Sequence, residues 1–368
     1  MKLQDCCVLI PSLSPDERLP AYVKELLAAD FRLILVVDDG SKEEYQPIFN
    51  EIAGWDRCHV LHHEVNRGKG AALRTGYTYL KEETDITGVI TADSDGQHIV
   101  PDTVMLANEL GQEKELLLGS RDFSKGSIQV PPKSRVGNRI TSVVFRLFYG
   151  HYLPDTQTGL RAFNRDLLDF MLAISGDRFE YEMNVLIQCA NQKVKMRALP
   201  INTIYHDDNA GTHFHPIRDS WRIYKLLLGS FIRYGAASIV SFLLDVGIVA
   251  LLMYWLFRDQ ADIQFLGIAF AAKALYAAPI ARLISAPVNF LLNKSFVFQT
   301  KESKGALARY FVLAFCSLVV TTLLYGYLDH FVTAAWLHIP LYILIQVAMY
   351  IVNYRIQKAW VFPAEKLI

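Results

Sequence analysis

The feature that most constrains the fold is a long apolar run at residues 231–257. A helix needs about 20 residues to cross the hydrocarbon core of a bilayer, so this run can span a membrane. Backbone polar groups inside a bilayer must be paired within the protein, which makes a helix the expected form. Residues 271–292, 310–328 and 340–355 are further candidate spans, although prolines and charges blur the limits of the second.

An internal repeat supports four spans rather than one. The sequence around Asn289 matches the sequence around Asn353, and Phe298 likewise corresponds to Phe362, so both pairs are 64 residues apart. Each repeat is then a helical hairpin that begins and ends on the same side of the membrane. The sequence therefore predicts an all-α transmembrane domain of four helices over residues 231–368.

Loop charges orient this domain. Lysine and arginine gather before the first span, between the second and third spans, and after the fourth span. Cytoplasmic loops carry an excess of these residues, so we expect both chain ends and the first half in the cytosol of a cell-membrane protein. The first residues lack the apolar core of a signal peptide, which agrees with this orientation.

The first half alternates short apolar runs with helical patterns, and the runs lie at residues 7–10, 33–37, 60–63, 88–92 and 116–119. Such alternation predicts an α/β domain with a mainly parallel sheet, which we place at residues 1–215. Ligands of these sheets bind beyond the carboxyl ends of the strands. A separate juxtamembrane amphipathic helix is expected at residues 216–230.

Composition excludes some classes of protein. The chain has 37 basic and 37 acidic residues, and this balance argues against a nucleic-acid partner, which would require a basic excess. Its five cysteines include no pair with zinc-like spacing, so we interpret them as small buried hydrophobic residues in a reducing compartment.

Two carboxylates, Asp93 and Asp95, follow the apolar run that ends at residue 92. Carboxylates two positions apart on a turn can converge on one hard divalent cation, and Mg²⁺ typically takes one or two of them together with phosphate oxygens. Taken alone, the triplet is weak evidence and is more often a plain surface turn, so its meaning depends on its surroundings.

Five motifs in order provide those surroundings, at residues 36–41, 66–73, 91–98, 119–121 and 155–161. Together they resemble family 2 glycosyltransferases of the dolichyl-phosphate-mannose-synthase-like branch, over about residues 5–215. The resemblance implies a GT-A, Rossmann-like domain that uses Mg²⁺ or Mn²⁺ and inverts the sugar. The donor would be a nucleotide-sugar, with UDP-glucose or UDP-N-acetylglucosamine favoured and GDP-mannose open. The acceptor would be a polyprenyl (undecaprenyl) phosphate lipid.

The resemblance also implies roles for single residues. The implied donor-binding residues are Pro11, Asp38, Asp39, Arg67, Lys69, Asp93, Thr212 and His213. The implied metal ligands are Asp93, Asp95 and Gln97. Arg121 and Arg135 would neutralise phosphates, because a guanidinium fork fits phosphate oxygens. Asp95, Arg121 and Glu182 would be catalytic, with Glu182 positioning the acceptor. The sequence departs from the family at His213, where several relatives have lysine, and at Leu13, where relatives often have Tyr-Asn.

Two stretches, at residues 135–149 and 217–231, combine an apolar face with a basic face, as helices at a membrane interface do. Residues 289–298 resemble GtrA-like membrane domains. Within the spans we predict an ion pair between Asp245 and Arg282, with their side chains within about 8 Å, because charges inside a membrane are costly and tend to pair.

Three points stay open in the sequence. We expect a homo-oligomer bound to the membrane. The membrane domain could also help move the sugar-lipid across the bilayer. A processive polysaccharide synthase is the remaining alternative, but the Gln-x-x-Arg-Trp element of those relatives is missing from the sequence.

Overall fold

The chain forms two compact units, one spanning Met1–Leu227 and a second that begins at Leu228. The computed structural model describes residues 1–111, 113–122, 132–202, 204, 216–256, 263–265, 268–270, 272–300, 305–329, 331 and 334–363. The predicted boundary at residue 230 does not coincide with a helix end, because helix α8 runs without a break over Pro216–Leu251. No proline interrupts residues 217–251, so the basic stretch and the apolar stretch share one helix.

The first unit is built on a seven-stranded sheet with the order β3-β2-β1-β4-β6-β5-β7. Its strands are β1 (Cys6–Ser12), β2 (Leu33–Asp38), β3 (Cys58–His62), β4 (Gly88–Thr91), β5 (Glu115–Arg121), β6 (Arg161–Asn164) and β7 (Lys195–Ile201). Only β6 is antiparallel to its neighbours, β4 and β5. The mainly parallel sheet confirms the prediction and adds two strands, β6 and β7, that the apolar runs did not reveal.

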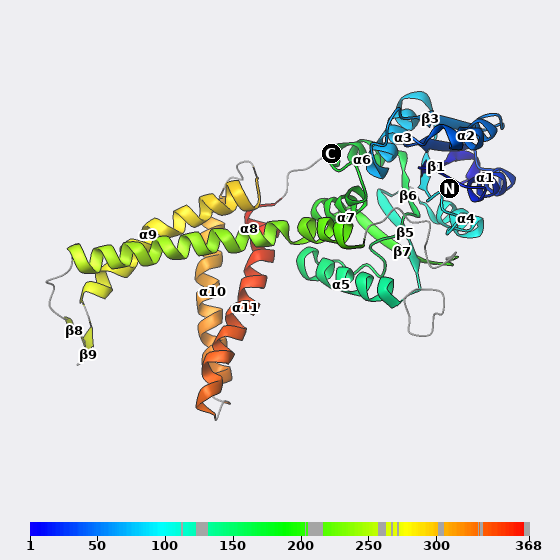
Figure 1. Cartoon of the computed structure of the whole chain (residues 1–368). Helices are drawn as coiled ribbons and strands as arrows, with labels where there is room; N and C mark the ends of the chain where they lie inside the picture. Colours follow the sequence, from blue (N-terminus) through cyan, green and yellow to red (C-terminus); the bar gives the residue numbers. More distant parts are fainter. Residues whose placement is uncertain are drawn as a thin grey trace. The chain divides into compact units, whose positions relative to one another are not determined.

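Helices cover the sheet of the first unit (Figure 1). They are α1 (Arg18–Ala28), α2 (Gln46–Ala53), α3 (Lys69–Glu83), α4 (Val100–Glu109), α5 (Pro132–Tyr149), α6 (Leu168–Ala173) and α7 (Glu180–Gln192). In α1 the fully buried Leu19, Val23 and Leu26 recur at helical spacing and join the core beside β1 and β2. Gly76 of α3 lies so close to Leu9 of β1 that a side chain there would clash. The strands are therefore buried by close helix–sheet contacts, as the continuous apolar runs predict.

The sheet topology brings distant segments to one edge. The parallel strands β2, β4 and β5 end at this edge with Asp38, Thr91 and Arg121. Since β6 runs the other way, it begins there with Arg161, which pairs with Thr91. The loops that follow β2 and β4 and the loop that precedes β6 are thus neighbours, although more than a hundred residues separate the first from the last.

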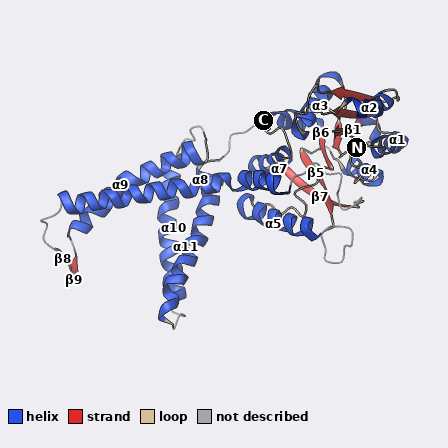
Figure 2. Ribbon diagram, in the orientation of Figure 1, coloured by secondary structure: helices blue, strands red, loops and turns tan. Residues whose placement is uncertain are grey.

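The second unit is mostly helical (Figure 2). Beyond α8, its helices are α9 (Ala272–Leu292), α10 (Ala306–Asp329) and α11 (His338–Ile356). Three helices in the described part are long and apolar enough to cross a membrane, at Tyr224–Leu256, Ala306–Leu328 and His338–Val361. The second predicted span, residues 271–292, corresponds to α9, which contains Pro279 and Pro287 and does not belong to this set, so it stays a prediction. A short hairpin of β8 (Ile263–Phe265) and β9 (Ile268–Phe270) corrects the all-α expectation.

The 64-residue repeat is visible in the backbone. Helices α9 and α11 each continue into a π-helical turn, at Asn293–Val297 and Gln357–Val361. The first residues of these turns contact each other, because Asn293 Nδ2 donates to Gln357 Oε1 at 3.1 Å. Gln357 Nε2 in turn donates to the Tyr234 hydroxyl at 3.1 Å. Equivalent positions of the two hairpins therefore meet in one buried amide pair, Asn293 with Gln357.

Candidate functional site

Asp39, the second residue of the Asp-Asp turn after β2, fixes a neighbouring loop. Its carboxylate accepts hydrogen bonds from the backbone N–H of Arg67 at 2.9 Å and of Gly68 at 2.7 Å. His63 Nδ1 lies 2.7 Å from the same carboxylate, and His63 Nε2 lies 2.9 Å from Thr75 Oγ1. Asp39 is buried and its carboxylate already accepts hydrogen bonds within the protein, so its expected contact with a nucleotide stays a prediction.

Asp38 closes β2 and organises the turn itself. It accepts hydrogen bonds from Ser41 N at 2.8 Å and Gln46 Nε2 at 3.0 Å, and His62 Nδ1 lies 3.0 Å away. Burial raises the pKa of this carboxyl, but the hydrogen bonds outweigh burial and leave its pKa below the ordinary value. Asp38 thus holds the turn in place, and its expected role in binding the donor stays a prediction. Pro11, the other residue expected at this edge, is buried in β1.

Asp93 lies in a cluster of opposite charges. Lys69 Nζ, at the start of α3, is 2.7 Å from Asp93 Oδ1 and 2.9 Å from Glu182 Oε1 of α7. His98 Nε2 lies 3.5 Å from Asp93 Oδ2. Burial raises the pKa of Asp93, but the charge of Lys69 and the contact with His98 more than offset it, and the pKa falls well below its ordinary value. Asp93, Asp95 and Glu182 with Lys69 are called the carboxylate cluster below.

Asp95 carries the opposite shift. Its Oδ1 accepts a hydrogen bond from the backbone N–H of Gln97 at 3.0 Å, which shapes the turn. Burial and the charge of Asp93 together raise the pKa of Asp95. The two carboxylates therefore oppose each other's ionisation, and a cation between them would relieve this repulsion. Their oxygen chemistry fits Mg²⁺ or Mn²⁺, which need only one or two protein carboxylates beside phosphate oxygens. In the described part of the chain no group of three or more His, Cys, Asp or Glu residues converges on one metal position.

Gly159 makes room for Asp93. A Cβ atom at this glycine would lie 2.5 Å from Asp93 Oδ1 and still closer to Oδ2. The position is held by Thr91, whose hydroxyl donates to the Gly159 carbonyl at 2.8 Å. Antiparallel β6 brings this glycine, which belongs to the 155–161 motif, against the metal motif of residues 91–98. The two motifs are thus one site in space.

Arg121 is engaged by the same motif. Its Nε and Nη2 donate to the two oxygens of the fully buried Asp155 carboxylate, at 2.7 and 3.0 Å. Asn138 of α5 stabilises this loop, because its side chain accepts from Thr156 N at 3.0 Å and donates to the Pro154 carbonyl at 2.6 Å. This forked ion pair orients Arg121 at the sheet edge, and its contact with a phosphate stays a prediction.

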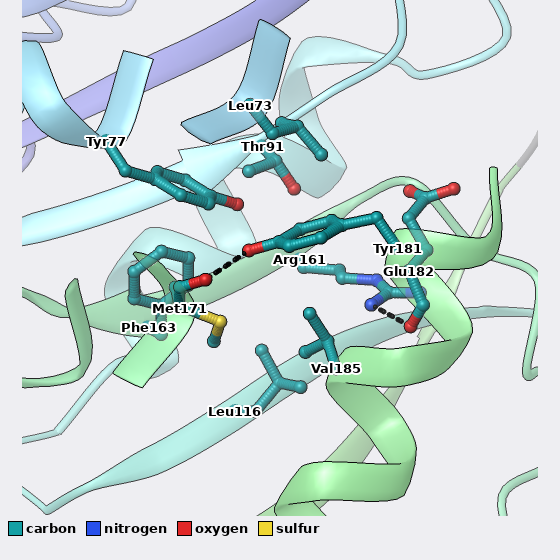
Figure 3. A pocket seen from close by; sticks show the side chains of 10 residues that line it. All are labelled: Leu73, Tyr77, Thr91, Leu116, Arg161, Phe163, Met171, Tyr181, Glu182 and Val185. Carbon is teal, nitrogen blue, oxygen red and sulfur yellow. Dashed lines mark hydrogen bonds between the residues drawn. The ribbon is translucent and has the colours of Figure 1, made fainter. Parts of the chain in front are cut away.

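Arg161 connects the sheet to α7 beneath this site. Its Nη1 donates to the backbone carbonyl of Glu182 at 2.9 Å, and its Nε donates to the Thr158 carbonyl at 3.0 Å. Figure 3 shows this contact at the wall of a small cavity, with the Tyr181 hydroxyl donating to the Met171 carbonyl on another side. The cavity has room for about one water (about 10 Å³), so it is too small for a sugar. Arg161 instead fixes the first turn of α7, which carries Glu182.

Helix α5 exposes an apolar stripe in the first unit. Val136, Ile140, Val143 and Leu147 are exposed at spacings of four, three and four residues, which places them on one helix face. Phe145 and Phe148 point into the core instead. The exposed basic residues Arg139 and Arg146 flank the stripe, and Arg135 is half-buried at its start. This is the amphipathic pattern predicted for residues 135–149.

Other predicted residues have different outcomes. Thr212 and His213 lie outside the described residues. In the second unit, Arg282 Nη2 is 3.3 Å from Asp245 Oδ2, which is the ion pair that the sequence predicts. Ser285 Oγ also donates to Asp245 at 2.6 Å.

Sequence reasoning missed four residues that build the site. His98, Asp155 and Gly159 lie inside motifs that were recognised, but no role was assigned to them. His63, beside Asp39, lies outside every motif. A signal existed for Gly159, because a glycine within an otherwise polar motif indicates close approach of another group.

Comparison with known protein families identifies both units. Residues 7–172 match the model of glycosyl transferase family 2, and residues 263–362 match that of the GtrA/DPMS transmembrane domain. An uncharacterized protein of Methanocaldococcus jannaschii is 29% identical over 225 residues, which cover 60% of this chain and 90% of the relative.

Two further relatives have named activities. The UDP-N-acetylglucosamine–dolichyl-phosphate N-acetylglucosaminyltransferase of Methanococcus voltae is 28% identical, with 54% of this chain and 85% of the relative covered. Polyprenol monophosphomannose synthase of Mycolicibacterium smegmatis is 27% identical, with 54% and 77% covered. The chain therefore joins a family 2 glycosyltransferase domain to a GtrA/DPMS transmembrane domain.

Proposed function

We propose that this protein transfers a sugar from a nucleotide-sugar to a polyprenyl phosphate at the membrane surface. The observation that carries the proposal is the carboxylate cluster, in which Lys69 contacts both Glu182 and Asp93, one of the two predicted metal carboxylates. Two relatives are named for sugar transfer to dolichyl phosphate and for polyprenol monophosphomannose synthesis. Their names support the acceptor class.

Asp93 and Asp95, with Gln97, are the residues that would hold Mg²⁺ or Mn²⁺. Such a cation supplies positive charge that neutralises the departing nucleoside diphosphate. Arg121, oriented by Asp155, and Arg135 would add positive charge for the phosphates of donor and acceptor. The donor is UDP-glucose or UDP-N-acetylglucosamine in our proposal, with GDP-mannose as the alternative.

The acceptor phosphate attacks the anomeric carbon of the sugar while the bond to the diphosphate breaks, and the configuration at that carbon inverts. A phosphate monoester is already mostly ionised near pH 7, because its second pKa is about 6. No strong general base is then required, and Glu182 orients the acceptor instead. Its place on α7, fixed by Arg161 and paired with Lys69, suits a positioning role.

The exposed stripe of α5 supports a lipid acceptor. Apolar side chains on one face with arginines beside them are typical of a helix that lies in the membrane interface. We propose that Val136, Ile140, Val143 and Leu147 enter the interface and hold the catalytic edge near the lipid headgroups. The cytosolic orientation of the first unit, the four spans and a homo-oligomer belong to the same proposal.

A donor screen tests this function. The purified full chain would be incubated with undecaprenyl phosphate, Mg²⁺ or Mn²⁺ and each labelled nucleotide-sugar, and label in the lipid fraction would be counted. Asp95→Asn should reduce transfer by about 100-fold, whereas Asp169→Asn, at an exposed carboxylate paired with Lys81, should leave it unchanged. Transfer that persists in Asp95→Asn or in EDTA would rule out the metal role. No labelled lipid with any donor would rule out the function.

A second candidate function is movement of the sugar-lipid across the bilayer. The contact between Asp245 and Arg282 within the second unit favours it, since charged side chains inside membranes often mark a pathway. Vesicles containing the protein and labelled product would decide the question. Movement no faster than in empty vesicles would leave the second unit an anchor.

A further inference from the structure

Close backbone contacts fix the start of helix α3, where Lys69 is the first residue. Gly68 has a φ of +101°, a conformation that side chains rarely adopt, and Ala71 N donates to the Asp177 carbonyl at 3.0 Å. A Cβ atom at Gly70 would lie 2.5 Å from Tyr181 Cβ. These glycines let α3 approach the segment that leads into α7.

One ammonium therefore serves two carboxylates from different elements. Lys69 Nζ contacts Asp93 after β4 at 2.7 Å and Glu182 on α7 at 2.9 Å. The Lys69, Asp93 and Glu182 side chains are 16%, 28% and 13% exposed, so water screens these contacts only partly. Asp95 lies two residues after Asp93, so the carboxylate cluster contains three carboxylates and one ammonium.

This arrangement has a consequence for a divalent cation. A cation that binds Asp93 meets the positive charge of Lys69 on the same carboxylate, and Lys69 also holds Glu182. On the proposed function, Asp93 belongs to the donor side of the reaction and Glu182 to the acceptor side. We propose that Lys69 is a positioning residue that couples the cation site at Asp93 and Asp95 to Glu182, because one ammonium is shared between them. This inference rests on the cation site of the proposed function.

The coupling predicts opposite changes in cation affinity. In Lys69→Met the competing charge is gone, so the full chain should bind Mn²⁺ about tenfold more tightly. In Glu182→Gln, Lys69 keeps only Asp93 as a partner, so Mn²⁺ should bind about fivefold more weakly. Lys69→Arg keeps the charge and should stay near wild type.

The measurement is electron paramagnetic resonance of unbound Mn²⁺, titrated into the full chain in detergent without donor or lipid. Lys81→Met is the matched control. Lys81 also pairs with a carboxylate and lies on α3, but it is at the other end of that helix from the site. The double variant Lys69→Met with Glu182→Gln measures the coupling. With Lys69 absent, Glu182→Gln should change the Mn²⁺ affinity by no more than about twofold, since close residues that share a partner are not additive.

Two results would overturn the inference. One is an Mn²⁺ affinity that is unchanged or weaker in Lys69→Met. The other is that the effects of Lys69→Met and Glu182→Gln on this affinity are additive in the double variant. Circular dichroism checks that each variant folds, and if Lys69→Met does not fold, Glu182→Gln alone decides, because an unchanged or tighter affinity there contradicts the shared ammonium. A wild-type chain that binds no Mn²⁺ would instead refute the cation site of the proposed function. Wild-type binding that Asp95→Asn abolishes, with no effect of Lys69, would refute the coupling alone.

Discussion

The two units bury polar side chains in different ways. In the first unit, the sheet edge gathers formal charges such as the Arg121–Asp155 pair and the carboxylate cluster. In the second unit, the buried amide pair of Asn293 and Gln357 is neutral, and its partner Tyr234 is neutral as well. The charged groups of the first unit come from loops that are distant in sequence. The amide pair of the second unit comes from equivalent positions of a repeat of 64 residues.

On the proposed function, the charged edge binds a cation, whereas the amide pair is a contact within the protein. Asp93 and Glu182 share the ammonium of Lys69, so negative charge is left for a cation to neutralise, and a buried charge without a partner is costly. The amide pair is neutral, although its Asn293 Oδ1 accepts no hydrogen bond, and in a membrane such hydrogen bonds contribute only modestly to stability. The charged edge is therefore where ligand binding should change the protein, and the amide pair should respond to substitution alone.

The largest expected effect concerns the Arg121–Asp155 pair. Asp155→Asn removes the charge that accepts the forked contact from the partly buried Arg121, which should cost about 3 kcal/mol and lower the unfolding midpoint of the full chain by about 8 °C. The control is Asp16→Asn, which breaks the solvent-exposed Asp16–Arg18 pair and should cost less than about 1 kcal/mol. Equal midpoints for the two variants would contradict the distinction between buried and exposed charge.

The next effect concerns activity. Gly159→Ala places a methyl group against the Asp93 carboxylate, so that carboxylate must move. A displacement of about 1 Å can cost about 100-fold in rate, and we expect that loss in sugar transfer, with weaker Mn²⁺ binding. Gly137→Ala on α5 is the matched control, because no atom lies within 4 Å of a Cβ atom there. Full activity in Gly159→Ala would show that the position of Asp93 does not matter.

The third effect concerns the charged pair of the second unit. Arg282→Met removes the charged partner of Asp245 and leaves the hydrogen bond from the Ser285 hydroxyl, and an intramembrane charge without its ion pair should cost about 2 kcal/mol. The double variant with Asp245→Asn should recover most of that loss. Thermal unfolding in detergent measures both. If the double variant were no more stable than Arg282→Met, the two residues would not act as a pair.

The fold was predictable where periodicity was strong. Five strands and the long helices follow from apolar runs, but β6 has only four residues and begins with the charged Arg161. In β7, at the edge of the sheet, charged and apolar residues alternate at the start and Pro200 follows. The strand therefore has no continuous apolar run. The second span is blurred for a similar reason, because two prolines and Arg282 interrupt α9.

The sequence predicted which residues belong to the site, but it did not predict which side chains contact each other there. The motif at residues 91–98 identifies Asp93 and Asp95, yet no spacing shows that Lys69 reaches both Asp93 and Glu182. That contact depends on where the start of α3 meets the start of α7, and on the reversed direction of β6. Such long-range geometry is set by packing, which local sequence does not reveal.

The smallest expected effect tests the neutral half of the comparison. Asn293→Leu removes the donor to Gln357 Oε1, while Gln357 still donates to Tyr234, so the loss should be about 1 kcal/mol. Replacing both partners, with Asn293→Leu and Gln357→Leu, leaves no unpaired amide on either side and should restore part of the stability. The unfolding midpoint in detergent measures both variants. A loss of stability in Asn293→Leu as large as in Asp155→Asn would contradict the contrast between the two units. Neutral partners at equivalent positions of a repeat would then contribute as much to stability as a buried ion pair does.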